Sequence, residues 1–176
     1  LPIQATAIFS HQEALFERKV AALALELKAR DQSQVSTIFP SVEGALNFSK
    51  VPSEKNLSIF GQEPLVDLFD SISNRKTVNA KNIPTCYSAH LRASHIPNDD
   101  SYLLVTGWVE FADFETNDFF VTNEKFELSG FLIGRQLLSS DVMRKINFSN
   151  GTYFKGYITN NINNNTSWVI PTNLKC

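Results

Sequence analysis

The apolar residues of this chain change their spacing once, near residue 72, and this change constrains the fold more than any other feature. Before it, apolar residues recur every three or four positions, as they do along one side of a helix. After it, they alternate with a period of two, as they do along a β-strand. Helices followed by strands are typical of an α+β fold. We therefore expect an α+β fold with N-terminal helices packed on an antiparallel sheet.

The first part of the chain predicts one long amphipathic helix. From Ser10 to Leu27, apolar residues recur at helical spacing with charged residues between them. Ser10 and Glu13 have the spacing of a capping box, in which the hydroxyl accepts from a free N–H of the first turn and the carboxylate reaches back. We therefore expect this helix to begin at Ser10.

Shorter elements are expected between this helix and the change of spacing. A short helix at residues 34–38 should end before Pro40, which cannot continue it. Residues 42–48 alternate weakly and predict a short strand. Residues 63–72 carry apolar side chains on one side and acidic ones on the other, which predicts a second short helix after a turn at Gly61.

The second part of the chain predicts a sheet. Six strands are expected, at residues 78–83, 87–94, 102–114, 120–134, 152–159 and 167–174. Residues 97–100 have the composition of a hairpin turn. Gly107 and Gly130 lie inside long strands, where glycine usually marks a bulge or a sharp bend, so the sheet should be strongly curved. Residues 137–150 fit no strand, and we expect them to be a loop insertion before the last hairpin of a single domain, residues 1–176.

Composition and charge argue against several classes of function. The 16 basic and 18 acidic residues give a net charge of -2, so no overall basic field favours nucleic acid. No apolar run is long enough to span a membrane. The two cysteines, Cys86 and Cys176, are too few for a zinc site of the paired-cysteine type, and no glycine-rich phosphate loop is present. The sequence therefore predicts no metal, no cofactor and no membrane partner.

Several short motifs follow one another in a recognisable order. After the long first helix come Phe60-Gly61-Gln62-Glu63, Tyr102-Leu103-Leu104-Val105-Thr106-Gly107, Phe126-Glu127-Leu128-Ser129-Gly130-Phe131-Leu132-Ile133 and Trp168-Val169-Ile170-Pro171-Thr172-Asn173. Their order and spacing resemble the nuclear transport factor 2-like family over most of the chain. The family's last strand usually runs into an Asn-Asp pair, from which this chain departs at Asn173-Leu174. The resemblance implies a cone-shaped fold in which helices cover a curved sheet.

The resemblance also implies a function. The chain looks like the binding domains of the mRNA export receptor and its small partner, which pair through the faces of their sheets. A hydrophobic pocket in such domains accepts phenylalanine-glycine repeats of nucleoporins. These features imply a non-catalytic domain of the nucleus and cytoplasm that works as a heterodimer or a homodimer.

Alternation along the strand at residues 102–114 gives a physical basis for such pairing. Val105 and Val109 fall on one side and Leu104 and Trp108 on the other, so neither side is polar. If helices cover only one side, the other side is left to bury against a second chain. The residues that we predict at this interface are Trp108, Tyr102, Leu104, Arg92, Glu110 and Phe131. An inverted arrangement, with Trp108 facing the helices, stays open at this point.

A second hypothesis is an enzyme, because the same fold in bacteria houses isomerases, hydratases and cyclases. Their chemistry needs a histidine or carboxylate whose pKa is tuned inside the cone. The candidates are His90 and His95, with Glu110 or Asp113 as the acidic partner. No spacing singles out a pair of them, so the sequence predicts no catalytic residue.

A third hypothesis is a secreted or periplasmic ligand-binding domain with Cys86 bridged to Cys176. Its support is the absence of an initial methionine and the presence of several Asn-x-Ser/Thr sites, which suit a secreted glycoprotein. Two reduced cytosolic thiols are the alternative.

Overall fold

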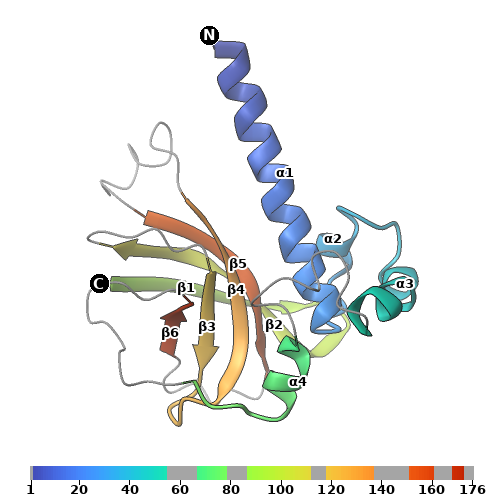
Figure 1. Cartoon of the computed structure of the whole chain (residues 1–176), viewed down its shortest axis with the longest axis vertical. Helices are drawn as coiled ribbons and strands as arrows, with labels where there is room; N and C mark the ends of the chain where they lie inside the picture. Colours follow the sequence, from blue (N-terminus) through green and yellow to red (C-terminus); the bar gives the residue numbers. More distant parts are fainter. Residues whose placement is uncertain are drawn as a thin grey trace. The chain divides into compact units, whose positions relative to one another are not determined.

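The computed structural model describes residues 2–54, 67–78, 87–111, 118–136, 151–160 and 168–172. The chain divides into two units, Leu1–Leu68 and Phe69–Cys176, and each is described by itself. The first unit holds the helices α1 (Pro2–Glu26), α2 (Gln32–Val35) and α3 (Val42–Glu54). The second holds almost all of the short helix α4 (Leu68–Ser73) and every strand of the described sheet (Figure 1).

The helix α1 is longer than the sequence predicts. It begins at Pro2, so the predicted start and capping box at Ser10 are wrong. Proline is well suited to the first turn of a helix, and the residues before Ser10 include good helix formers such as Ala5 and Ala7. Residues 20–27 are all buried, so the last two turns of the helix are covered on every side.

Side-chain amides hold α2 and the start of α3 in place. The Gln34 side chain, which is buried, donates to the carbonyl oxygen of Glu17 at 3.0 Å and to its Oε2 at 2.6 Å. This pair joins α2 to α1. The Gln32 side chain accepts from the backbone N–H of Val42 at 3.1 Å and donates to the carbonyl of Pro40 at 3.3 Å. The three helices therefore form one hydrogen-bonded assembly.

The strand predicted at residues 42–48 is wrong, because these residues begin α3. Ser41 precedes the helix and its Oγ accepts from the backbone N–H of Gly44 at 3.3 Å, as a capping serine does. Val42 and Ala45 are both buried, three positions apart, which is the spacing of a helix face. A cap followed by this pair is a stronger signal than the weak alternation on which the strand prediction depended.

The second unit contains one six-stranded sheet. Its strands are β1 (Tyr87–Ile96), β2 (Asp99–Phe111), β3 (Asp118–Thr122), β4 (Leu128–Gln136), β5 (Gly151–Thr159) and β6 (Trp168–Pro171). Their order is β1-β2-β5-β4-β3-β6, and every neighbouring pair is antiparallel. Figure 1 shows the sheet curling along this order. The predicted α+β fold with a curved antiparallel sheet is confirmed.

The single strand predicted at residues 120–134 is instead a hairpin of β3 and β4. Asn123 makes the turn: its Oδ1 accepts from the backbone N–H groups of Lys125 at 2.9 Å and Glu127 at 3.1 Å. Phe126 completes the turn in the left-handed region, with φ 59°. Such an asparagine turn needs no glycine, and without a glycine or proline at this point the sequence was assigned to one strand.

The other strand predictions differ in their outcome. The predicted hairpin turn at residues 97–100 is confirmed, with Asn98 in the left-handed region at φ 64°. Where the strand at 78–83 is predicted, Thr77 forms an isolated bridge with Glu127, and residues 79–86 lie outside the described residues. The predicted insertion at 137–150, the residues Gly61 and Asp113, and both cysteines also lie outside them.

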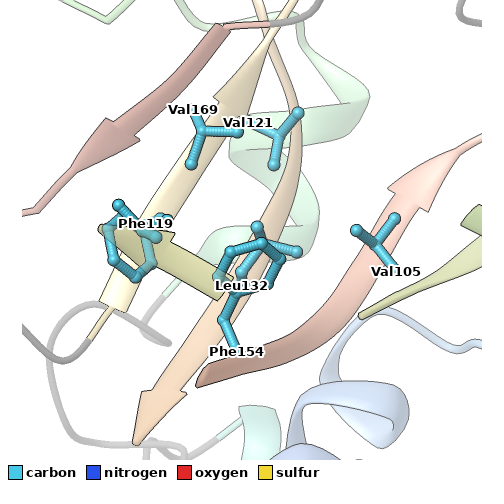
Figure 2. Packing of buried hydrophobic residues seen from close by; sticks show 7 residues of the cluster. Val105, Phe119, Val121, Leu132, Phe154 and Val169 are labelled. Atoms are coloured by element: carbon cyan, nitrogen blue, oxygen red, sulfur yellow. The ribbon is translucent and has the colours of Figure 1, made fainter. Parts of the chain in front are cut away.

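One cluster of the hydrophobic core of the second unit lies on one face of the sheet. Its buried members come from β2, β3, β4, β5 and β6, and they are Val105, Val109, Phe119, Val121, Leu132, Phe154 and Val169 (Figure 2). Phe119 on β3 and Phe154 on β5 lie on strands separated by β4. Their side chains converge on this face, where the two rings meet edge-on with their centroids 5.8 Å apart.

The two glycines predicted to bend the sheet act differently. At Gly130 the prediction of a bulge is confirmed, because Val121 pairs with Gly130 while Thr122 pairs with Leu128, leaving Ser129 as an extra residue. The Ser129 hydroxyl donates to the carbonyl of Val121 at 3.0 Å. Gly107 keeps a regular register on both sides. Its role is to permit close approach, because a Cβ atom there would lie 1.9 Å from a backbone oxygen.

Candidate functional site

The strand register places the predicted interface residues on one face of the sheet. One row runs across all six strands through Ser94, Leu104, Tyr157, Phe131, Phe120 and Ile170. A parallel row runs across four strands through His90, Trp108, Tyr153 and Arg135. Arg92 pairs with Thr106 between the two rows. We call this side of the sheet the Trp108 face.

The Trp108 face is opposite to that core cluster. Along β2, Val105 and Val109 belong to the core cluster, and Trp108 alternates with them. Trp108 therefore does not belong to that cluster, and the alternative in which Trp108 faces the helices stays a prediction. Trp108 is half-buried, whereas Val109 has no exposed surface.

Trp108 is held by a histidine from the neighbouring strand. The rings of His90 and Trp108 are stacked, with 5.0 Å between their centroids and 24° between their planes. The indole Nε1 of Trp108 is buried and has no hydrogen-bond partner among the described residues. An indole N–H is a donor only, and a buried donor without an acceptor costs about 1–3 kcal/mol. The site therefore keeps one unused hydrogen-bond donor.

The same row continues with a tyrosine and an arginine. Tyr153 pairs with Trp108 on one side and with Arg135 on the other. The guanidinium carbon of Arg135 lies 5.7 Å from the centroid of the Tyr153 ring, which is cation–π distance. Partial burial lowers the pKa of Arg135, and its electrostatic interaction with Tyr153 acts in the opposite direction.

Positive charge prevails among the described side chains of this face. The charged residues that register places on it are Arg92, Arg135, Lys155, Asp118 and Glu110, three basic and two acidic. The Asp118 carboxylate accepts a hydrogen bond from the backbone N–H of Gly134 at 3.2 Å, which connects β3 to β4. Arg92 is exposed, and Lys155 and Arg135 are half-buried. The face thus combines aromatic rings with cationic groups.

Burial divides the predicted interface residues into two groups. Phe131 has no exposed surface and Tyr102 has 7%, so both already lie inside this chain. Trp108 and Leu104 are half-buried and Arg92 is exposed. The backbone of Glu110 pairs with Ser88 and Gly151. The surface that remains for a partner is therefore the part of the Trp108 face on β1, β2 and β5 together with Arg135 near the end of β4, and the predicted interface itself stays a prediction.

Phe131 is buried and has large aromatic neighbours on both adjacent strands. It packs edge-on against Phe120, with 5.4 Å between the ring centroids, and pairs with the fully buried Tyr157. Sequence alternation assigns Phe131 to the correct face but gives no information on how deeply that part of the face is covered. Tyr153 and Arg135 were missed, because only the register between distant strands brings them beside Trp108.

The histidines proposed for an enzyme do not form a site together. His90 is exposed and stacks on Trp108, and His95 is exposed five positions along the same strand, on the opposite side. No group of three metal-binding side chains occurs among the described residues.

Comparisons with models of protein families, with curated proteins and with solved structures found no match to this chain. Among the described residues, no helix is both long and apolar enough to cross a membrane. The fold and the Trp108 face are thus the observations on which a function can be proposed.

Proposed function

We propose that this chain is a protein-binding domain that pairs with a second chain through the exposed part of the Trp108 face. The observation that carries the proposal is the row of His90, Trp108, Tyr153 and Arg135, half open to solvent on a sheet whose opposite face holds the core cluster. Tryptophan, tyrosine and arginine are the residues that most often dominate binding energy at protein interfaces. A row of them on three adjacent strands suits that role.

The geometry of Trp108 supports an interface in particular. Its ring is fixed by the stacked His90, so little side-chain entropy is lost when a partner covers it. Arg92 and Lys155 would lie at the rim, where charges contribute mainly to orientation and association rate.

The resemblance to the nuclear transport factor 2-like family supports a finer proposal. The partner would be a second chain of the same fold, in a nuclear and cytoplasmic complex of mRNA export that also binds phenylalanine-glycine repeats. The confirmed α+β fold with a curled sheet is compatible with this assignment.

The test begins with the mass of the purified chain, measured by light scattering during size-exclusion chromatography. If the chain is a homodimer, its dimer affinity is measured directly. If it is a monomer, it is used as bait, and the protein that it captures is purified and titrated against it. Trp108→Asp should weaken either pairing by at least about a hundredfold, or roughly 2.7 kcal/mol, as expected at an interface hot spot.

The matched control is Trp168→Asp. Trp168 is the other tryptophan of the chain, is 42% exposed, and stacks on Phe126 at 6.4 Å near the far edge of the sheet. The Trp168→Asp substitution should change the affinity of the pairing by less than about threefold. Equal affinity for the two variants, with circular dichroism spectra like that of the original chain, would reject the proposed face. A synthetic phenylalanine-glycine repeat peptide tests the finer proposal separately.

A further inference from the structure

The strand β1 lies at one edge of the described sheet, where one side of its backbone has no partner among the described strands. It pairs with β2 on one side, and no described strand pairs with it on the other. Its length of ten residues exceeds that of β6, the opposite edge strand, which has four. Such an edge offers a row of free N–H and C=O groups to another extended chain.

This edge is open on both faces. Residues 90–95 are six consecutive exposed positions, so no described part of the chain covers either side of the strand. Edge strands are commonly protected by lysine, by proline or by a bulge. β1 contains neither lysine nor proline, and its one irregularity lies at its end, between His95 and Ile96.

The side chains of β1 differ between its two faces. His90, Arg92 and Ser94 lie on the Trp108 face, and Ala89, Leu91 and Ala93 lie on the opposite one. Leu91 is 44% exposed, which is unusual for a leucine in a sheet with a well-formed core. The strand carries no aspartate or glutamate. A strand that complements β1 would therefore alternate acidic residues on one face with apolar residues on the other.

We propose that the free edge of β1 binds an acidic, extended segment of a partner protein, which joins the sheet as a seventh strand. Its acidic side chains lie beside Arg92 and His90, and its apolar side chains lie beside Leu91 and Ala93. The segment is a peptide because the edge presents alternating N–H and C=O groups at strand spacing, which another backbone matches. This site shares His90 and Arg92 with the Trp108 face, but it is argued from the backbone edge of β1 and does not depend on the pairing proposed above.

Charge argues against a second copy of the chain as the occupant. Two antiparallel β1 strands with Leu91 at their centre would place Arg92 of one copy directly beside His90 of the other. Neither strand would bring a carboxylate to pair with them. Residues of unlike charge facing each other across strands stabilise a sheet, and a second β1 supplies no such pair.

The test uses three synthetic peptides of about eight residues, within the normal length of a strand. The first alternates glutamate and valine, the second has lysine in place of glutamate, and the third is the acidic peptide with two adjacent N-methylated residues at its centre. N-methylation removes one N–H from each edge of the peptide and so blocks β-pairing without changing its charge. Binding to the full chain is measured by fluorescence anisotropy.

We expect the acidic peptide to bind roughly tenfold more tightly than either control. Arg92→Glu should reverse the preference between the acidic and the lysine peptide. Arg18→Glu makes the same charge change at an exposed position of α1 and should leave the preference unchanged. Equal binding of the acidic and lysine peptides, or an unchanged preference in Arg92→Glu, would overturn the proposal, as would no binding.

Hydrogen exchange provides a readout that charge attraction alone would not change. The acidic peptide should slow the exchange of amides in residues 87–96 and leave those in residues 168–171 unchanged. Protection elsewhere, with none in β1, would overturn the proposal. A dimer of the chain that protects β1 and excludes the peptide would show that a second copy occupies the edge, which also overturns it.

Discussion

The ring of Phe154 on β5 lies against Gly107 on β2, with its Cζ atom 2.9 Å from where a Cβ atom of that glycine would be. The two residues are paired in register, and Gly134 pairs with Phe154 on the other side. Phe154 therefore has a glycine on each neighbouring strand, and its ring extends into the core instead of meeting a side chain in its own row. The edge-on contact with Phe119 depends on this space.

Gly107→Ala should destabilise the second unit by about 3 kcal/mol or more. The added Cβ would also lie 1.9 Å from the backbone oxygen of His90, which cannot move without disturbing β1–β2 pairing. Both tryptophans, Trp108 and Trp168, belong to this unit, so denaturant unfolding followed by tryptophan fluorescence reports on it. Phe154→Leu should not rescue the variant, because the backbone contact remains.

Gly44→Ala is the control for that substitution. The nearest atom to a Cβ at Gly44 is 3.6 Å away, which is ordinary contact, and the residue lies inside α3. Alanine should stabilise the helix by about 0.5–1 kcal/mol. A similar loss of stability in both glycine variants would contradict the explanation by close approach.

Asp31→Ala should lower the stability of the first unit by about 1–2 kcal/mol. The Asp31 side chain is buried and caps α2, where its Oδ1 accepts from the N–H of Gln34 at 3.0 Å and from the hydroxyl of Ser33 at 2.7 Å. Asp31→Asn keeps an acceptor oxygen and should lose less stability than Asp31→Ala does. Thermal unfolding followed by helical circular dichroism makes this comparison, and an equal loss in the two variants would argue against a capping role.

Asn123→Ala should destabilise the β3–β4 hairpin by about 1–3 kcal/mol. Besides accepting two backbone hydrogen bonds, the Asn123 amide donates to Oε2 of Glu127 at 2.8 Å, and alanine removes all of these contacts. Lys125→Ala, at an exposed position in the same turn, should change stability by less than about 0.5 kcal/mol. Amide exchange of β3 and β4 distinguishes a local opening of the hairpin from global unfolding.

Stability should fall at alkaline pH because of Tyr102. Burial, together with the nearby charge of Asp99, raises the pKa of Tyr102 from 10.0 to about 12. The folded chain therefore holds the phenol proton more tightly than the unfolded chain does. This contribution to stability is complete below pH 10 and is lost as the pH rises from 10 to about 12. Denaturant unfolding across that range should show a weaker pH dependence in Tyr102→Phe; identical pH dependence would contradict the assignment.

Most of the sheet could be predicted from the sequence because alternation survives wherever one face is buried. It gave β1, β2 and β5 nearly correctly and placed Trp108 opposite Val105 and Val109. Alternation gave the wrong prediction where a hydrogen bond from one local side chain determines the backbone conformation. The cap at Ser41 selects helix over strand, and the turn at Asn123 divides the strand predicted at residues 120–134 into two.

The candidate site could be predicted only in part, for a different physical reason. Alternation assigns each residue to a face of its own strand, but the neighbour across the sheet depends on strand order and register. Tyr153 and Arg135 lie beside Trp108 only because β5 pairs with β2 and β4 pairs with β5. The contact of Phe131 with Phe120 was likewise missed, because the sequence placed both residues in one strand at residues 120–134.

The pairing of β2 with β5 also has a consequence for how the chain folds. The β1–β2 and β3–β4 hairpins join neighbouring segments and need little loop closure. The pairing of β2 with β5 joins strands that are separated in the sequence by β3 and β4, so it must close a long loop. Such non-local contacts slow folding, because the entropy of closing the loop is lost before the contacts form. Until then the β2 edge is unpaired, so association between chains competes with this step and refolding yield should fall as protein concentration rises.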